Sequence, residues 1–261
     1  MIALHTPVRR AVLLVAGRGT RLGDITKERP KCLVEVAGLS ILERALDALA
    51  ESGVEHIVLV VGFHAEQVVA AVGHEYRGMR VTYVDNTRYA ETNTSYSLWL
   101  AREHLDRPLF LIEGDIVFED AIVKRMIRVT EDESVWAAIP VAPDRDEGIL
   151  LEETDDGHIG RVERILEAPD RPPHLSHKCA GIQLLTRDLA LAMAGRLDRA
   201  VQEGEIRKFA DLLLADLIPE NPVRLCSVEG TRWSEIDDAA DLETAHEVFV
   251  SEPALKKAGG A

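Results

Sequence analysis

Short apolar runs alternate with helix-like segments through the first half of this 261-residue chain. An apolar run of about four to eight residues is typical of a buried strand, and apolar residues three and four apart are typical of a helix. Strands that alternate with helices form βαβ units, in which helices cover a parallel sheet. The strands predicted in this half are residues 11–15, 56–61, 80–84 and 109–113.

The clearest helix signal follows the first predicted strand. Ser40 and Glu43 have the spacing of a capping box, and Gly53 is typical of the position just beyond a helix end. Between them, Leu42 and Leu46 lie on one helical face. Two further helices are predicted over residues 65–72 and 94–104.

The pattern changes in the second half. Asp155, Asp156 and Gly157 form a turn signal between two strand-like runs, which predicts an antiparallel hairpin. Residues 169–174, which include Arg171, have the composition of a mobile loop near a site. The elements predicted here are the strands 149–153, 161–165, 178–185, 223–228 and 233–236 and the helices 119–128, 189–195, 207–218 and 240–250.

These elements together predict an α/β protein. Its sheet is expected to be Rossmann-like, open, mixed and mostly parallel, flanked by helices and with antiparallel strands inserted. The length suits a single domain over about residues 1–250, with one half to about residue 118 and a second half over 119–250. Residues 251–261 are expected to form a frayed tail.

A loop with two glycines follows the first predicted strand. Glycine lets the backbone turn sharply and approach a ligand closely, so that successive N–H groups can face phosphate oxygens. Arg21 and, further on, Lys31 add the positive charge that a triphosphate requires. The loop therefore predicts an anion site, and an ordinary glycine turn with solvated charges is the simpler alternative. The loop residues are Ala16, Gly17, Arg18, Gly19, Thr20, Arg21 and Leu22.

Two common phosphate-binding loops do not match this one. A P-loop has four residues between its glycines and then Lys followed by Ser or Thr, so Gly17 and Gly19 lie too close together. In the dinucleotide fingerprint the third glycine would come one residue earlier than Gly23 does. The spacing therefore excludes both motifs.

The charge balance disfavours some partners. With 30 Lys and Arg against 45 Asp and Glu, the formal net charge is −15, which argues against nucleic acid and anionic membranes as partners. No apolar run reaches the roughly 18 residues of a membrane span, and residues 1–10 lack the apolar core of a signal peptide. Cys32, Cys179 and Cys226 lie far apart, which argues against zinc and disulfides. We therefore expect a cytoplasmic protein that gathers cations locally around an anionic substrate.

The glycine loop resembles a known signature. The stretch from Gly17 to Leu22, with Pro30 and Lys31, is similar to the signature loop of the sugar-nucleotidyltransferase superfamily. With Ala16 and the run Arg-Pro-Lys-Cys-Leu it most resembles the phosphocholine and phosphonate cytidylyltransferase-like branch. The resemblance covers nearly the whole chain and implies a nucleotide-binding first half and an acceptor-binding second half. It also implies nucleotide contacts from Ala16, Gly17, Arg18, Gly19 and Thr20 and catalytic roles for Arg21 and Lys31.

A second motif follows the strand 109–113, where Gly114 and Asp115 end an apolar run. Ligands of open α/β sheets bind at this carboxyl edge, and Mg²⁺ binds one or two carboxylates together with phosphates and water. Glu235 and Asp237 lie on one face of a late strand. The resemblance implies that Asp115, Asp237 and Glu235 bind Mg²⁺ and that Gly114 contacts the nucleotide. The alternative is that Asp115 and Asp237 cap the helices 119–128 and 240–250.

The segment around Asn93 is also similar to the cytidylyltransferase-like branch, in which Asn followed by Tyr-Ser-Leu begins a helix beside the base and the acceptor. Asn93 has donors and acceptors that suit a pyrimidine edge. The resemblance implies that Asn93 and Ser97 bind the nucleotide and that Tyr96 contacts the acceptor. Lys178 is a candidate for binding the acceptor's phosphate or phosphonate. The alternatives are helix capping by residues 92–95 and a solvated Lys178.

These motifs predict an enzyme. The reaction implied by the resemblance is Mg²⁺-dependent transfer of CMP from CTP to the phosphate or phosphonate of a small acceptor, with release of pyrophosphate. Because only 5% of the residues are aromatic, a full aromatic cage for choline is not expected. One alternative is a sugar-1-phosphate nucleotidyltransferase that uses UTP, dTTP or GTP. Another is a nucleotide-sensing subunit without turnover, and similar proteins lead us to expect a homodimer.

Overall fold

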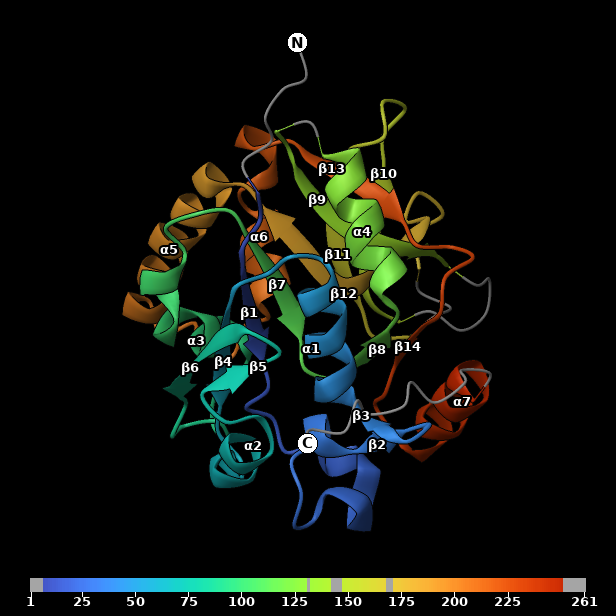
Figure 1. Ribbon diagram of the computed structural model, residues 1–261. Coiled ribbons are helices and arrows are strands. Elements are labelled where there is room, and N and C mark those ends of the chain that lie inside the picture. Colours follow the sequence, from blue (N-terminus) through green and yellow to red (C-terminus); the bar gives the residue numbers. More distant parts are fainter. Residues whose placement is uncertain (1–6, 131, 142–146, 168–170, 251–261) are drawn as a thin grey trace.

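The computed structural model describes residues 7–130, 132–141, 147–167 and 171–250, and its centre is a large mixed sheet (Figure 1). The predicted tail over 251–261 and residues 169 and 170 of the predicted proline-rich loop lie outside the described residues. Within these ranges the sheet has ten strands. They are β1 (Arg10–Leu14), β4 (His56–Val61), β5 (Glu75–Tyr76), β6 (Met79–Asp85), β7 (Leu109–Glu113), β9 (Ser134–Pro140), β10 (Gly148–Glu153), β11 (Ile159–Ile165), β12 (His177–Leu185) and β13 (Val223–Ser227).

The strand order is β11-β10-β12-β7-β1-β4-β6-β5, with β9 beside β12 and β13 beside β9. Two small sheets pair β2 (Glu35–Val36) with β3 (Leu39–Ser40) and β8 (Ile116–Phe118) with β14 (Trp233–Glu235). None of the described helices is long and apolar enough to cross a membrane. The α-helices are α1 (Ile41–Glu51), α2 (Ala65–Val72), α3 (Thr94–Leu100), α4 (Asp120–Val129), α5 (Arg187–Gln202), α6 (Ala210–Ala215) and α7 (Ala239–Phe249).

The centre of the sheet confirms the α/β prediction. β1 pairs in parallel with β4 and β7, and β4 pairs in parallel with β6. β12 then joins β7 in the antiparallel sense, and β10 and β11 form the predicted antiparallel hairpin. The carboxyl ends of four neighbouring parallel strands, β7, β1, β4 and β6, therefore lie at one edge, where the glycine loop follows β1.

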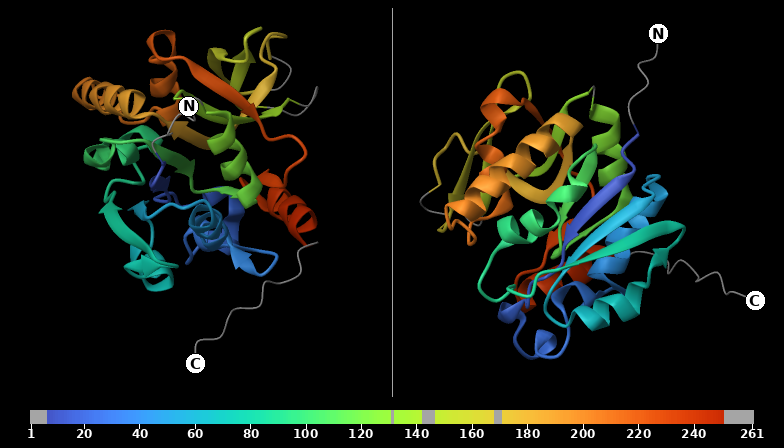
Figure 2. Two further views of the ribbon diagram at one scale, coloured as in Figure 1. Left: turned by 45° about the horizontal axis from the view of Figure 1, so that its top comes forward. Right: turned by 90° about the vertical axis from the view of Figure 1, so that its left-hand side faces the viewer.

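Alternate residues of β1 face two helical layers, which Figure 2 shows on opposite faces of the sheet. Ala11 and Leu13 belong to the core on the side of α1 and α4, whereas Val12 and Leu14 belong to the core on the side of α3, α5 and α6. This alternation follows from the two-residue period of a strand. Because both faces are covered, the strand is apolar at every position from Ala11 to Leu14.

A third, smaller core attaches α7 to the segment after β1. Phe249 of α7 and Ile236 after β14 pack with Leu22 of the glycine loop and with Val36. Residues close to the end of the described chain are thereby held against residues close to its beginning. This packing places Asp237, which lies between β14 and α7, beside the glycine loop.

Three predicted helices differ from the structure in their bounds. The helix predicted over 94–104 ends at Leu100 and continues as a separate 3-10 turn, Arg102–His104. The helix predicted over 189–195 extends from Arg187 to Gln202, and Thr186 caps its start by accepting the N–H of Leu189. The helix predicted over 207–218 contains only Ala210–Ala215. β9 is absent from the prediction, and it forms because β12 and β13 pair with its two edges.

His56 gives the fold a predictable dependence on pH. Its buried ring lies at the start of β4, where Nε2 is 2.9 Å from the Thr82 hydroxyl and Arg80 donates to Nδ1 at 3.3 Å. Burial, together with the charges of Arg80 and Arg10, lowers the pKa of His56 from 6.5 to about 4. Between these two values the unfolded chain binds a proton that the folded protein does not, so stability falls as the pH is lowered.

His56→Gln is expected to remove this part of the pH dependence. The parent protein should lose about 2 kcal/mol of unfolding free energy from this group between pH 7 and pH 5, and the variant should not. Urea unfolding at the two pH values measures the difference. His74→Gln, at an exposed position, is the matched control and should keep the parent behaviour. An equal loss of stability in the parent and in His56→Gln would show that His56 does not titrate in this way.

Candidate active site

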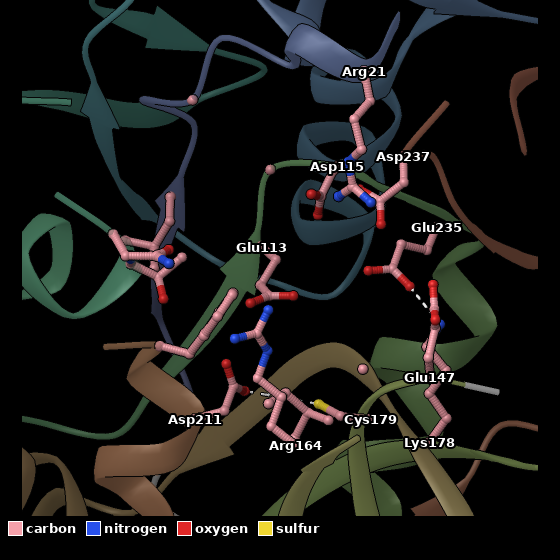
Figure 3. Close-up of a pocket in the computed structure, with 18 of the residues that line it drawn as sticks. Arg21, Glu113, Asp115, Glu147, Arg164, Lys178, Cys179, Asp211, Glu235 and Asp237 are labelled. Atoms are coloured by element: carbon pink, nitrogen blue, oxygen red, sulfur yellow. Dashed lines mark hydrogen bonds and ion pairs between the residues drawn. The ribbon is translucent and has the colours of Figure 1, made fainter. Parts of the chain in front are cut away.

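A cavity of about 1000 Å³ opens at the carboxyl edge of the parallel strands (Figure 3). Ala16 and Gly17 follow β1, Asn86 follows β6, and Asp115 follows β7. Ligands of open α/β sheets bind at this edge. Further described walls come from α3, α6, α7, the strands β9 to β12 and the residues around β14. Both halves of the sequence therefore line the cavity.

The glycine loop turns toward Lys31. Gly19 has a φ of 64°, which side chains disfavour, and a Cβ at this position would lie 2.8 Å from the Cβ of Lys31. The Thr26 hydroxyl donates to the Gly19 carbonyl at 2.7 Å and holds the turn. By contrast, a Cβ on Gly17 would meet no atom within 4 Å, and this residue lines the cavity. The turn therefore requires Gly19, whereas Gly17 leaves space for a ligand.

Lys31 joins two carboxylate motifs that lie far apart in the sequence. Its Nζ is 2.9 Å from Asp115 Oδ2 and 3.1 Å from Asp237 Oδ1. Arg21 Nη2 is 2.6 Å from the same Asp237 oxygen (Figure 3). Burial alone would lower the pKa of Lys31, but Asp115 and Asp237 together raise it. The pKa of Asp237 is lowered, since Lys31 and Arg21 outweigh the effect of burial. Lys31 and Asp237 are therefore charged partners at neutral pH.

Neither Asp115 nor Asp237 caps a helix, so this alternative is wrong. The N-cap of α4 is Glu119, which makes no capping hydrogen bond through its side chain. The N-cap of α7 is Asp238, whose side chain accepts from two backbone N–H groups of the first helical turn. Both aspartates instead contact Lys31.

The side chains at this edge fit a Mg²⁺ ion. Asp115 Oδ2 is bonded to Lys31, whereas Asp115 Oδ1 is buried without a hydrogen-bond partner and is an oxygen that can serve as a ligand. Among the described residues, no three His, Cys, Asp or Glu side chains are grouped so that they could hold a metal on their own. The pair Asp115 and Asp237 is nevertheless sufficient for Mg²⁺ where phosphates and water supply the other ligands.

Lys178 and Glu235 form an ion pair in another part of the cavity (Figure 3). Lys178 Nζ lies 2.8 Å from Glu235 Oε2, and the Lys178 side chain is only 19% exposed. Burial raises the pKa of Glu235, although Lys178 opposes this shift. Lys178, which is predicted to contact the acceptor, is thus paired with Glu235, which is predicted to bind the metal. The alternative of a solvated Lys178 is therefore wrong.

Asn93 both caps a helix and lines the cavity. Its Oδ1 accepts the N–H of Thr94 at 2.8 Å at the start of α3, so the capping interpretation is confirmed. Ser97 lies one turn further along α3 and also lines the cavity. Tyr96 does not belong to the described lining, and its ring packs against Trp99 with the ring centres 5.3 Å apart.

The residues predicted to bind nucleotide divide into two groups. Arg18, Gly19 and Thr20 do not belong to the described lining of the cavity, and the Arg18 guanidinium lies 5.0 Å from the centre of the Phe63 ring. The residues of this set that line the cavity are Ala16, Gly17, Asn93, Ser97 and Gly114.

Two acids that the sequence does not single out also line the cavity. Glu113 and Asp211 share a hydrogen bond, and burial together with Asp211 raises the pKa of Glu113 well above its ordinary value. Burial also raises the pKa of Asp211, whose Oδ1 accepts from Gln183 Nε2 at 2.7 Å. The sequence does contain a signal for Glu113, because a carboxyl group at the last position of an apolar strand indicates a residue at the ligand-binding edge of the sheet. Asp211 lies among leucines in α6 and has no comparable signal.

The fold and this site define an α/β protein with cations and carboxylates gathered around a glycine loop at the sheet edge. Residues 11–211 match the family described as the MobA-like NTP transferase domain. The chain therefore belongs to this family of nucleotidyltransferases, and the predicted superfamily is confirmed.

Known relatives agree with this assignment. The CMP-5'-(3-aminopropyl)phosphonate synthase of Streptomyces rubellomurinus is 37% identical over 250 residues, which are 90% of this chain and only 38% of that protein's length. The UTP–glucose-1-phosphate uridylyltransferase of Haloferax volcanii is 32% identical over 63% of this chain and 67% of that protein. The structure of the CTP:phosphocholine cytidylyltransferase from Streptococcus pneumoniae superposes with a TM-score of 0.77 and 25% identity, over 92% of this chain and 99% of that one.

Proposed function

We propose that this chain is a Mg²⁺-dependent cytidylyltransferase, which transfers CMP from CTP to the phosphate or phosphonate of a small acceptor and releases pyrophosphate. The observation that carries the proposal is the contact of Lys31 with both Asp115 and Asp237, which gathers cations and carboxylates beside the glycine loop. The likeness to proteins named as cytidylyltransferase and CMP-phosphonate synthase supports CTP as the nucleotide.

The proposed reaction brings two anions together. Lys31 and Arg21 neutralise the triphosphate, and the open space at Gly17 admits phosphate oxygens close to the backbone. Asp115 and Asp237 would hold Mg²⁺, which would supply further charge neutralisation. An acceptor oxygen attacks the α-phosphorus as the bond to the bridging oxygen breaks, and pyrophosphate leaves with the electron pair. The residues thus act by positioning and charge, and no protein nucleophile is required.

The acceptor end of the cavity favours a zwitterion. Lys178 can bind a phosphate or phosphonate group. The carboxyl groups of Glu113 and Asp211 line the same cavity, and a negative charge on either of them would stabilise a cationic group on the acceptor. One face of Phe209 is covered by the Arg164 guanidinium, 4.6 Å from the ring centre, and is not available to a quaternary ammonium. We therefore propose an aminoalkyl phosphonate as the acceptor, and phosphocholine is the comparison to test, because Tyr89 and Trp233 also line the cavity.

Pyrophosphate release tests the proposal directly. CTP, UTP, dTTP, ATP and GTP are each supplied with Mg²⁺ and one of four acceptors: 2-aminoethylphosphonate, 3-aminopropylphosphonate, phosphocholine or glucose 1-phosphate. We expect turnover with CTP and an aminoalkyl phosphonate. Turnover with UTP and glucose 1-phosphate would instead establish the sugar-nucleotide alternative, which the likeness to the uridylyltransferase favours. Nucleotide binding without turnover of any acceptor would identify a sensing subunit.

A further inference from the structure

The chain between β14 and α7 is held at three successive backbone N–H groups. The N–H of Ile236 donates to the carbonyl oxygen of Asp115 at 2.9 Å. The next two N–H groups, those of Asp237 and Asp238, both donate to Oδ2 of Asp241, at 2.8 Å and 3.1 Å. The backbone of Asp237 is therefore fixed on one side to the segment of Asp115 and on the other side to the first turn of α7.

Asp241 makes one hydrogen bond more than its helix cap requires. In the capping box of α7, Asp238 accepts the N–H groups of Ala240 and Asp241, and Asp241 accepts the N–H of Asp238 in return. The same Asp241 oxygen also accepts the N–H of Asp237, which lies outside the box. This additional bond connects the start of the helix to a carboxylate that contacts Lys31.

Contacts on several sides fix α7 and with it Asp241. The last residue of the helix, Phe249, is fully buried, and the guanidinium groups of Arg44 and Arg232 lie 4.7 Å and 5.5 Å from the centre of its ring. One turn earlier, His246 Nδ1 accepts the N–H of Ala37 at 3.3 Å. These partners come from α1, from the chain before β14 and from the turn between β2 and β3. A side chain at the start of such a helix has a well-defined position.

The side chain of Asp237 is held by groups that the substrate requires. Lys31 Nζ and Arg21 Nη2 lie 3.1 Å and 2.6 Å from the same oxygen, Asp237 Oδ1. Under the proposed function these two cations turn to the triphosphate, so Asp237 loses part of their support when the nucleotide binds. Its backbone hydrogen bond to Asp241 does not depend on either cation and remains.

We propose that Asp241 is a positioning residue for Asp237 and that, by accepting the backbone N–H of Asp237, it keeps this carboxylate in place for Mg²⁺. This role rests on the proposed function, because it requires a metal at Asp237. Removing a group that orients a metal ligand typically weakens metal binding by about ten- to a hundredfold. Since Asp241 also lines the cavity, the alternative is a direct effect of its negative charge on the ligand.

Titration calorimetry of CTP binding, with Mg²⁺ or with EDTA in its place, tests this role without turnover. The quantity compared is the ratio of the two dissociation constants, which measures how much the metal tightens nucleotide binding. Asp241→Ala should reduce this ratio by about tenfold. Without metal it should bind CTP no more weakly than the parent does, because Lys31 and Arg21 are still present. Asp241→Asn keeps an oxygen for both N–H groups, so its ratio should stay within about threefold of the parent ratio.

Glu43→Ala is the matched control for the loss of a capping side chain. Glu43 has the same position in the capping box of α1, where it accepts the N–H of Ser40 at 3.0 Å, and it does not belong to the described lining of the cavity. Urea unfolding should show that Glu43→Ala and Asp241→Ala remain folded and lose a similar, small part of their stability. Glu43→Ala should nevertheless keep the parent ratio of dissociation constants.

An unchanged ratio in a folded Asp241→Ala protein would overturn the inference. An equal fall in Asp241→Asn would also overturn it, since the charge and not the hydrogen bond would then matter, and an equal fall in Glu43→Ala would reduce the effect to stability. Equal CTP binding by the parent with and without Mg²⁺ would overturn the inference together with the metal dependence of the proposed function. If the parent does not bind CTP in either condition, the proposed nucleotide is wrong, and the same comparison with UTP decides the role of Asp241.

Discussion

Lys31→Met is expected to lower turnover by about 10³-fold while the protein remains folded. Lys31 Nζ lies within 3.1 Å of both Asp115 and Asp237, and its side chain is 11% exposed. Without the ammonium group these two carboxylates face the incoming triphosphate with less compensating charge, so the barrier to phosphoryl transfer rises. Methionine has a similar length and preserves the apolar contact with the Gly19 turn. The expected loss of turnover therefore comes from the missing positive charge and not from disturbed packing.

The measurement is kcat and KM from pyrophosphate release, with circular dichroism as the check on folding. Lys27→Met is the matched control, because Lys27 is an exposed lysine in the same segment and its loss should change turnover by no more than about twofold. A folded Lys31→Met protein that retains turnover within about tenfold of the parent would exclude Lys31 from catalysis. An equal loss in both variants would indicate a general charge effect.

The local pattern of the sequence predicts one sheet edge well. Gly17 and Asp115 each follow a short apolar strand, and parallel pairing of β1 with β7 brings these two strand ends together. The sequence therefore predicts that both belong to one site. The contact of Asp237 with Lys31 has a different origin, since it depends on the packing of Phe249 in α7 against Leu22. For Asp237, only the family resemblance indicated the role, because packing between chain ends leaves no local signal.

Other features of the site depend on partners that no short window contains. Asn86 follows an ordinary strand, and it reaches the cavity together with Ser97, to which it is hydrogen-bonded in a separate element. Asp211 meets Glu113 through the packing of α6 against α3 and β11, and a single polar residue in α6 gives no local signal of this contact. By contrast, β9 does have a local signal that the prediction missed, because Val135 to Ile139 form an apolar run of strand length.

Gly114→Ala is expected to reduce stability by about 1 to 3 kcal/mol and turnover by about 10²-fold, although it adds only one methyl group. The added Cβ would lie 2.5 Å from the Leu14 carbonyl oxygen and 2.9 Å from Val15 Cγ1. Leu14 belongs to β1 and pairs with Glu113 in the parallel register, so the clash is relieved only if β1 and β7 separate at their carboxyl ends. That separation moves Asp115 away from the glycine loop.

Gly195→Ala separates this effect from a general response to glycine replacement. Gly195 lies on the exposed side of α5, and a Cβ there would meet no atom within 4 Å. This control should gain about 0.5 to 1 kcal/mol, because alanine favours a helix, and should keep its turnover. Urea unfolding and pyrophosphate release on both variants give the comparison. If Gly114→Ala keeps parent stability and turnover, the close approach of the β7 end to β1 is not what positions Asp115. If Gly114→Ala loses turnover although it remains folded under the assay conditions, the spacing of these two strand ends is itself part of the catalytic geometry.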